Sequence, residues 1–101
     1  MKIFISQPMR GKTDAEIKAE CERLIFKAKE HFGEDIEVID SFFEKAPADA
    51  RPLWFLGKSL ELLSTADAVV LAPDWDQARG CRIENICAIE YGIPMVEVYS
   101  K

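Results

Sequence analysis

Three acidic side chains that follow one apolar segment are the residues of this chain best suited to chemistry. Asp74 and Asp76 lie in a polar loop after the apolar run 68–72, and Glu84 lies near the start of the helix predicted behind that loop. Unpaired N–H groups and the positive dipole end of a helix favour a charged carboxylate. We therefore expect Glu84 to be ionised and to act as a nucleophile or an electrostatic stabiliser. Asp74 or Asp76 can protonate a leaving group if burial or mutual repulsion raises its pKa.

The same residues also fit a purely structural interpretation. A glutamate at a helix start commonly complements the helix dipole, and two aspartates after a strand are ordinary turn composition. Trp75, between the aspartates, offers a stacking face for a planar base, but it can also cover the core. Gly80, at the predicted helix start, lets the backbone approach a ligand closely. Their common place behind one buried strand favours the functional interpretation.

A second candidate site is a loop with two cations, formed by Gln7, Pro8, Met9, Arg10, Gly11 and Lys12. A guanidinium, a flexible glycine and an ammonium directly before a helix N-terminus suit an anionic group such as phosphate. The loop lacks the GxxxxGK[ST] spacing of a phosphate-binding P-loop. A turn with two exposed cations is the alternative.

Other catalytic arrangements are not visible in the sequence. The single histidine, His31, lies near a predicted helix end, where its charge is favourable, and its position suggests no serine or cysteine nucleophile as a partner. No cluster of metal-ligand residues is visible either. We therefore expect neither a metal nor another cofactor.

Four predicted strands and three predicted helices position these candidates. The predicted strands are Lys2–Ser6, Ile36–Ile39, Ala68–Ala72 and Met95–Val98, and the predicted helices run from the N-cap Thr13 to Gly33, over Leu53–Thr65, and from Arg79 through Ile83–Tyr91. Such alternation predicts a parallel sheet with right-handed crossovers and helices on both faces. The expected strand order is 2-1-3-4. The loops after the first and third strands then meet at the topological switch point, within reach of Glu84.

Composition indicates one small domain that acts on a small molecule or a protein. A chain of 101 residues, 49% of them hydrophobic, has enough apolar residues for one core but not for two. A net charge of -5 and 13 scattered basic residues argue against nucleic acid as a partner.

The short apolar start predicts neither a signal peptide nor a membrane span, so the cytoplasm is the expected compartment. Three cysteines without CxxC spacing fit reduced thiols, with Cys21 and Cys87 in the core.

Two further features concern the connection before the second long helix and that helix itself. The connection Asp40–Pro52 is long, and Ser41-Phe42-Phe43 within it can begin a short helical turn. In the helix, Leu56, Leu60 and Leu63 are expected to face inward, while Trp54 and Phe55 extend the apolar surface beyond one stripe. This excess predicts a subunit interface, and hence a homodimer or a larger homo-oligomer.

Several of these segments together resemble the nucleoside 2-deoxyribosyltransferase-like superfamily. The similar segments are IFISQPMRG at 3–11, ADAVV at 66–70, GCRIE at 80–84, Ala88, and YGIP at 91–94. The chain is most similar to short phage- and bacteria-associated members of uncharacterised function, and the resemblance covers nearly its whole length. It implies a single domain over 1–101 with a flavodoxin-like or Rossmann-like three-layer αβα fold.

The resemblance also implies roles for individual residues. Glu84 matches the family glutamate that attacks the anomeric carbon, giving a glycosyl-enzyme intermediate that a second base or water resolves. Arg10 and Gly11 look like the segment that lies against the 5′-phosphate in the nucleotide hydrolase branch. The family's active site is often completed by a neighbouring subunit. Two departures stand out, because Ser59 and Ala78 occupy places where characterised members carry helper acids.

The leading hypothesis is therefore cleavage or exchange of the base of a (deoxy)nucleoside or nucleoside monophosphate. Glu84 is the expected nucleophile, Asp76 or Asp74 the acid, and the loop 7–11 with Trp75 and Gly80 the substrate-binding part. A non-catalytic nucleotide-binding module of the same fold is the alternative, favoured by the missing helper acids. A structural dimer with a vestigial site is a third possibility.

Overall fold

The computed structural model describes residues 1–40 and 46–97 of the chain. Along the sequence its elements are β1 (Lys2–Ser6), α1 (Asp14–Phe32), β2 (Glu37–Val38), α2 (Pro52–Leu63), β3 (Ala68–Leu71), the 3-10 turn η1 (Trp75–Gln77), α3 (Arg79–Glu90) and β4 (Met95–Glu97). The predicted turn at Ser41-Phe42-Phe43 lies outside the described residues. No helix in the described parts of the chain is both long and apolar enough to cross a membrane.

The strands form one parallel sheet in the order β2-β1-β3-β4. The central pair β1 and β3 is in register from Ile3 opposite Ala68 to Ser6 opposite Leu71. Because all three pairings are parallel, the four strands end at one carboxyl edge of the sheet. The predicted α/β class and the strand order 2-1-3-4 are confirmed.

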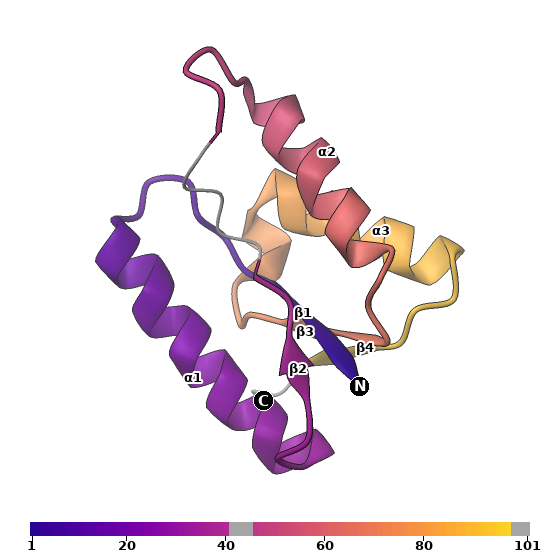
Figure 1. Cartoon of the computed structure of the whole chain (residues 1–101). Helices are drawn as coiled ribbons and strands as arrows, with labels where there is room; N and C mark the ends of the chain where they lie inside the picture. Colours follow the sequence, from indigo (N-terminus) through magenta and orange to yellow (C-terminus); the bar gives the residue numbers. More distant parts are fainter. Residues whose placement is uncertain (41–45, 98–101) are drawn as a thin grey trace.

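Helices cover both faces of this sheet, which gives the three layers visible in Figure 1. The pleat of β1 sends Ile3 and Ile5 toward Leu24 and Ala28 of α1. The intervening Phe4 packs on the other face, in one cluster with buried side chains of α2 and α3. Ser6 follows Phe4 at the same parity of the strand. Its side chain therefore faces the α2–α3 layer.

The ends of the elements follow local chemistry. Thr13 caps α1 through a capping box with Glu16, as predicted, and Gly33 with φ of 101° ends the helix. Helix α2 starts at Pro52, one residue before the predicted Leu53, because proline suits the first helical position. It ends at Leu63, before the predicted Thr65, and the Ser64 and Thr65 hydroxyls donate to helix carbonyl oxygens.

The ends of three other elements also differ from the predictions, and β3 ends at Leu71, one residue before the predicted Ala72. Strand β2 covers only Glu37–Val38 of the predicted Ile36–Ile39, although the N–H of Ile39 still donates to the carbonyl of Ile3 at 2.9 Å. Helix α3 ends at Glu90, not at Tyr91, and Gly92 follows with φ of 71°. That positive φ is the left-handed conformation in which a glycine usually ends a helix.

Candidate functional site

Glu84 lies on the buried side of α3, where the helix faces the carboxyl end of the sheet. The buried residues of α3 are Cys81, Glu84 and Ala88, whose spacing of three and four places them on one helix face. Ala88 packs against Phe4 and Val69 of the central strands. Glu84 is one turn closer to the helix start, and only 8% of it is exposed. A glutamate this buried is uncommon without a hydrogen-bond partner.

That partner is Ser6, the last residue of β1. Its hydroxyl donates to Oε1 of Glu84 at 2.8 Å, and only 1% of Ser6 is exposed. The strand pleat aims Ser6 at α3, as it aims Phe4. The contact ties the glutamate to the end of the strand from which the loop 7–12 leaves. Ser6 is not among the residues predicted for the site, although the alternation along β1 indicates the direction of its side chain.

The second carboxylate oxygen of Glu84, Oε2, has no partner in the described part of the chain. Ser6 is the only partner that the described residues give Glu84, and it contacts Oε1. Within the described residues, no buried side-chain nitrogen or oxygen lacks a hydrogen-bond partner. Oε2 is therefore not fully buried and keeps some contact with solvent. One oxygen is held by the protein and the other is available to a ligand.

Burial raises the pKa of Glu84 from 4.5 to about 7, and the Ser6 hydrogen bond opposes part of this rise. The prediction of a mainly ionised carboxylate at the helix N-terminus is therefore wrong. Glu84 lies in the second turn of α3, one turn away from the unpaired N–H groups, and the cost of removing its charge from water outweighs the helix dipole. Near neutral pH both protonation states are populated.

Cys81 adds a thiol beside Ser6 and Glu84, and these three residues are called the glutamate cluster below. Burial raises the pKa of Cys81 to about 11; the Ser6 hydroxyl lowers it, and the charges of Glu84 and Asp74 raise it. Such a thiol is protonated at neutral pH and is a poor nucleophile. Cys81 is therefore an uncharged, buried side chain beside Glu84. No role was predicted for it.

The loops after β1 and β3 are joined by an ion pair. Nζ of Lys12 lies 3.2 Å from Oδ2 of Asp74, with both side chains partly exposed. The ion pair lies near the glutamate cluster, because the charges of both residues act on the thiol of Cys81. Both loops are predicted parts of the site, but this contact between them was not predicted.

The other residues predicted for the loop after β3 point elsewhere. The carbonyl oxygen of Asp76 accepts from Arg82 at 3.0 Å, and its exposed carboxylate is 3.4 Å from the amide of Gln77. The indole of Trp75 packs on the core cluster shared by α2 and α3, and its N–H donates to Glu97 at 3.3 Å. In this arrangement Trp75 covers the core, which was the structural alternative. Asp74 is the acid that lies nearer to the cluster.

The loop 7–12 divides into a buried and an exposed part. The side-chain amide of Gln7 donates to the carbonyl oxygen of Ile17 at 3.0 Å, which ties the loop to α1. Pro8 is buried and Met9 half-buried, and the carbonyl oxygen of Met9 accepts from Lys12 N–H at 3.2 Å. Gln7 and Pro8 therefore support the loop, and the exposed residues after Met9 remain for a ligand.

Arg10 and Gly11 form the exposed tip of this loop. Gly11 has φ of 80°, a backbone conformation that favours glycine. The start of α1 behind the tip is already occupied, since Thr13 and Glu16 cap each other and Asp14 adds a further acid. An anion at this tip would therefore rely on the cationic side chains and not on the helix N-terminus.

Gly80, in the first turn of α3, borders open space. A Cβ atom built on it would meet no atom within 4 Å outside its own helix turn and chain neighbours. The protein's own packing therefore does not require glycine there, and a ligand can approach the backbone closely.

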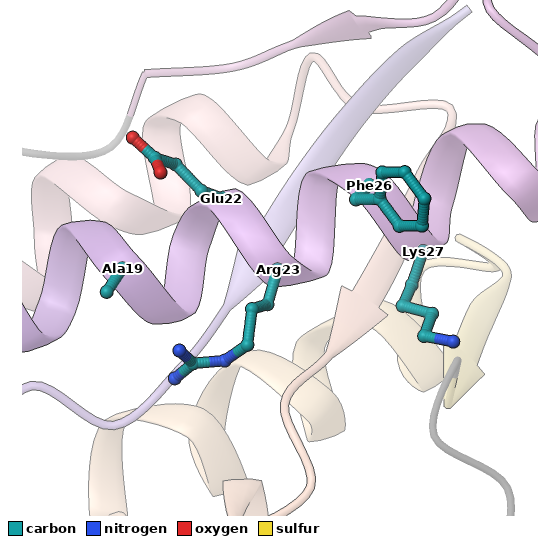
Figure 2. A pocket seen from close by; sticks show the side chains of 5 residues that line it. All are labelled: Ala19, Glu22, Arg23, Phe26 and Lys27. Carbon is teal, nitrogen blue, oxygen red and sulfur yellow. The ribbon is translucent and has the colours of Figure 1, made fainter.

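A hollow in the described surface lies away from all these residues, on the outer side of α1. Figure 2 shows its lining, which is Ala19, Glu22, Arg23, Phe26 and Lys27. All five belong to one helix, so the hollow is an open depression between side chains. Over residues 1–40 and 46–97, no group of three or more His, Cys, Asp and Glu residues is placed to hold a metal ion.

Comparison with models of known protein families, with curated proteins and with solved structures found no match. The chemistry of the cluster is therefore read from its geometry. A carboxyl group that titrates near neutrality, with one oxygen held and one accessible, can act as a nucleophile when ionised or as an acid when protonated.

Proposed function

We propose that this protein cleaves or exchanges the base of a (deoxy)nucleoside or a nucleoside monophosphate, with Glu84 as the nucleophile. The observation that supports it best is the position of Glu84 behind the carboxyl end of the central strands. There Oε1 is held by Ser6 and Oε2 is accessible. This edge of a parallel α/β sheet is where ligands usually bind. The resemblance of the segments 3–11 and 80–84 to the nucleoside 2-deoxyribosyltransferase-like superfamily supplies the reaction class.

In the proposed reaction, ionised Oε2 of Glu84 attacks the anomeric carbon. The bond to the base nitrogen breaks, its electron pair leaves with the base, and an acid supplies a proton to that base. Asp74, after it has taken up a proton from solvent, is the preferred acid because it lies near Cys81 and Glu84, whereas Asp76 is exposed. Water or a second nucleobase then attacks the anomeric carbon, the bond to Oε2 breaks with its electron pair returning to Glu84, and the proton of the attacking group passes to the Asp74 carboxylate. Arg10 and Lys12 contribute positive charge for a 5′-phosphate.

A non-catalytic nucleotide-binding module is the second candidate. It is favoured by Ser59 and Ala78 at the places of the family's helper acids, and by the ion pair that engages Asp74. Both candidates place the protein in the cytoplasm, which agrees with three free cysteine thiols. Both also include a homodimer or a larger assembly formed through α2.

The two candidates differ in turnover. The wild-type protein is incubated with a panel of deoxynucleosides, ribonucleosides and their monophosphates, free base is followed by chromatography, and binding is measured by calorimetry. Release or exchange of at least one base supports the enzyme. Binding without release supports the module. Absence of both would contradict both proposals and leave a structural role.

A further inference from the structure

We propose that Ser6 is a positioning residue for Glu84, which it holds by Oε1 so that Oε2 is presented to the substrate. This inference rests on the proposed function for its catalytic consequence. Its structural part, that the Ser6 hydroxyl fixes the carboxyl group and favours its ionised form, can be tested without any turnover.

The backbone of Ser6 is held by the neighbouring strand β3. Ser6 is paired with Leu71 of β3, and its carbonyl oxygen accepts the N–H of Ala72 at 2.9 Å. The residue is 1% exposed, so its side chain has little room for another rotamer. A hydroxyl held on a central strand therefore defines one position for Oε1 of Glu84. The contact joins residues that are 78 positions apart, one in β1 and one in α3, so it also connects α3 to the sheet.

The chemistry of a hydroxyl suits this task in both protonation states. A serine hydroxyl has one proton to donate and two lone pairs to accept. With ionised Glu84 it donates, as at the observed 2.8 Å, and with protonated Glu84 it can accept the carboxyl proton. An apolar side chain at this place would leave a buried carboxylate oxygen without a partner. That loss disfavours the ionised form, which is the form the nucleophile needs.

The other groups near Glu84 cannot replace this hydrogen bond. The thiol of Cys81, on the same helix, is a weak donor and remains protonated. Asp74 carries a like charge, and Lys12 is paired with Asp74. Among the described residues, Ser6 is therefore the one neutral strong donor placed on this carboxylate.

The test compares Ser6→Ala, which removes the hydroxyl, with Ser6→Thr, which keeps it. The titration of Glu84 is followed by NMR of a 13C-labelled side-chain carboxyl group in each folded variant, with exposed Glu90 as an internal reference. Charge-assisted hydrogen bonds are strong enough that Ser6→Ala should raise the pKa of Glu84 by about one unit. Ser6→Thr should return it toward the wild-type value. Glu90 should titrate alike in all three proteins.

The pH dependence of kcat/KM provides the catalytic readout. Its acidic limb should shift to higher pH as the pKa of Glu84 rises. Ser6→Ala should therefore lose about tenfold in kcat/KM at pH values below the pKa of Glu84 and much less at pH values above it. A uniform loss at every pH would overturn the claim that the Ser6 hydroxyl favours the ionised form of Glu84, and an unchanged rate at every pH would overturn the positioning role. If Ser6→Thr does not fold, Ser6→Cys takes its place, and its weaker donor should give a titration between those of wild type and Ser6→Ala.

The two proposals fail in different ways. An unchanged Glu84 titration in folded Ser6→Ala overturns the role of Ser6, whatever the activity of the protein. A shifted titration in a protein that releases no base supports the hydrogen bond and overturns the catalytic use of it.

Discussion

Nζ of Lys12 lies 3.2 Å from Oδ2 of Asp74, so one ion pair joins the loop after β1 to the loop after β3. Both side chains are partly exposed, and such pairs contribute less than about 1 kcal/mol. A ligand phosphate can therefore compete with Asp74 for Lys12 at small cost. Its binding would free Asp74 to take up a proton from solvent and pass it to the leaving base.

Loss of a cation from the exposed part of the loop should affect phosphorylated substrates selectively. Because phosphate contacts are charge-assisted, Arg10→Ala or Lys12→Ala should raise KM for a nucleoside monophosphate by about tenfold and change KM for the nucleoside much less. Lys29→Ala, near the far end of α1, is the matched control and should change neither. Equal losses for both substrates would contradict the assignment.

Removal of Asp74 should have the opposite effect on binding. In Asp74→Ala, Lys12 no longer has its carboxylate partner, so monophosphates should bind more tightly, by a few-fold, in calorimetry at low salt. Base release should fall in the same variant if Asp74 is the acid. Weaker monophosphate binding in Asp74→Ala would show that Asp74 contacts the ligand directly.

The raised pKa of Glu84 predicts how stability varies with pH. The unfolded chain loses this proton near pH 4.5, whereas the folded protein keeps it up to about pH 7. Its contribution to stability is therefore full below pH 4.5 and is lost as pH rises to 7, by roughly 3 kcal/mol. In Glu84→Gln this loss should disappear. Urea unfolding at pH 5 and pH 8 measures the difference, and the variant should gain on the wild type at pH 8.

The assembly prediction concerns the exposed apolar side chains of α2. Leu53 is 75% exposed and Phe55 37%, and on the same layer α3 exposes Ile86 and Ile89. Light scattering at micromolar concentration should give at least a dimer, which Leu53→Asp dissociates. Phe26→Asp makes the same kind of change, from an exposed apolar side chain to aspartate, but on the outer side of α1, and it should leave the assembly intact. A monomeric wild type would overturn this prediction.

The sequence was sufficient for the fold and for the neighbourhood of the site. Apolar runs that alternate with amphipathic helices leave few topologies, and the observed order 2-1-3-4 is one of those that the crossover rules allow. Placing Glu84 behind the third strand required only this order. The pairing of Lys12 with Asp74, 62 positions apart, depends on how two loops meet, which no local pattern encodes.

The protonation of Glu84 could not be read from the sequence. The sequence shows that Glu84 is near a helix start, where the dipole favours its ionised form. The cost of burying that charge depends on how α3 is rotated against the sheet, which the sequence does not show. The same rotation decides that Ser6, a small residue at the end of an apolar strand, meets Glu84. The direction of Trp75 likewise follows from the turn at η1, whose residues carry no periodic signal.

The central claim is that Glu84 is the nucleophile, and Glu84→Gln tests it most directly. The amide keeps the size of the side chain but removes the charge that attacks the anomeric carbon. Release of free base from the best substrate of the panel is followed by chromatography, with binding measured in parallel. Glu90→Gln, an exposed change at the end of the same helix, is the matched control. We predict that Glu84→Gln retains binding and loses base release by at least about a thousandfold, while Glu90→Gln matches the wild type. Base release by folded Glu84→Gln at the wild-type rate would contradict the account.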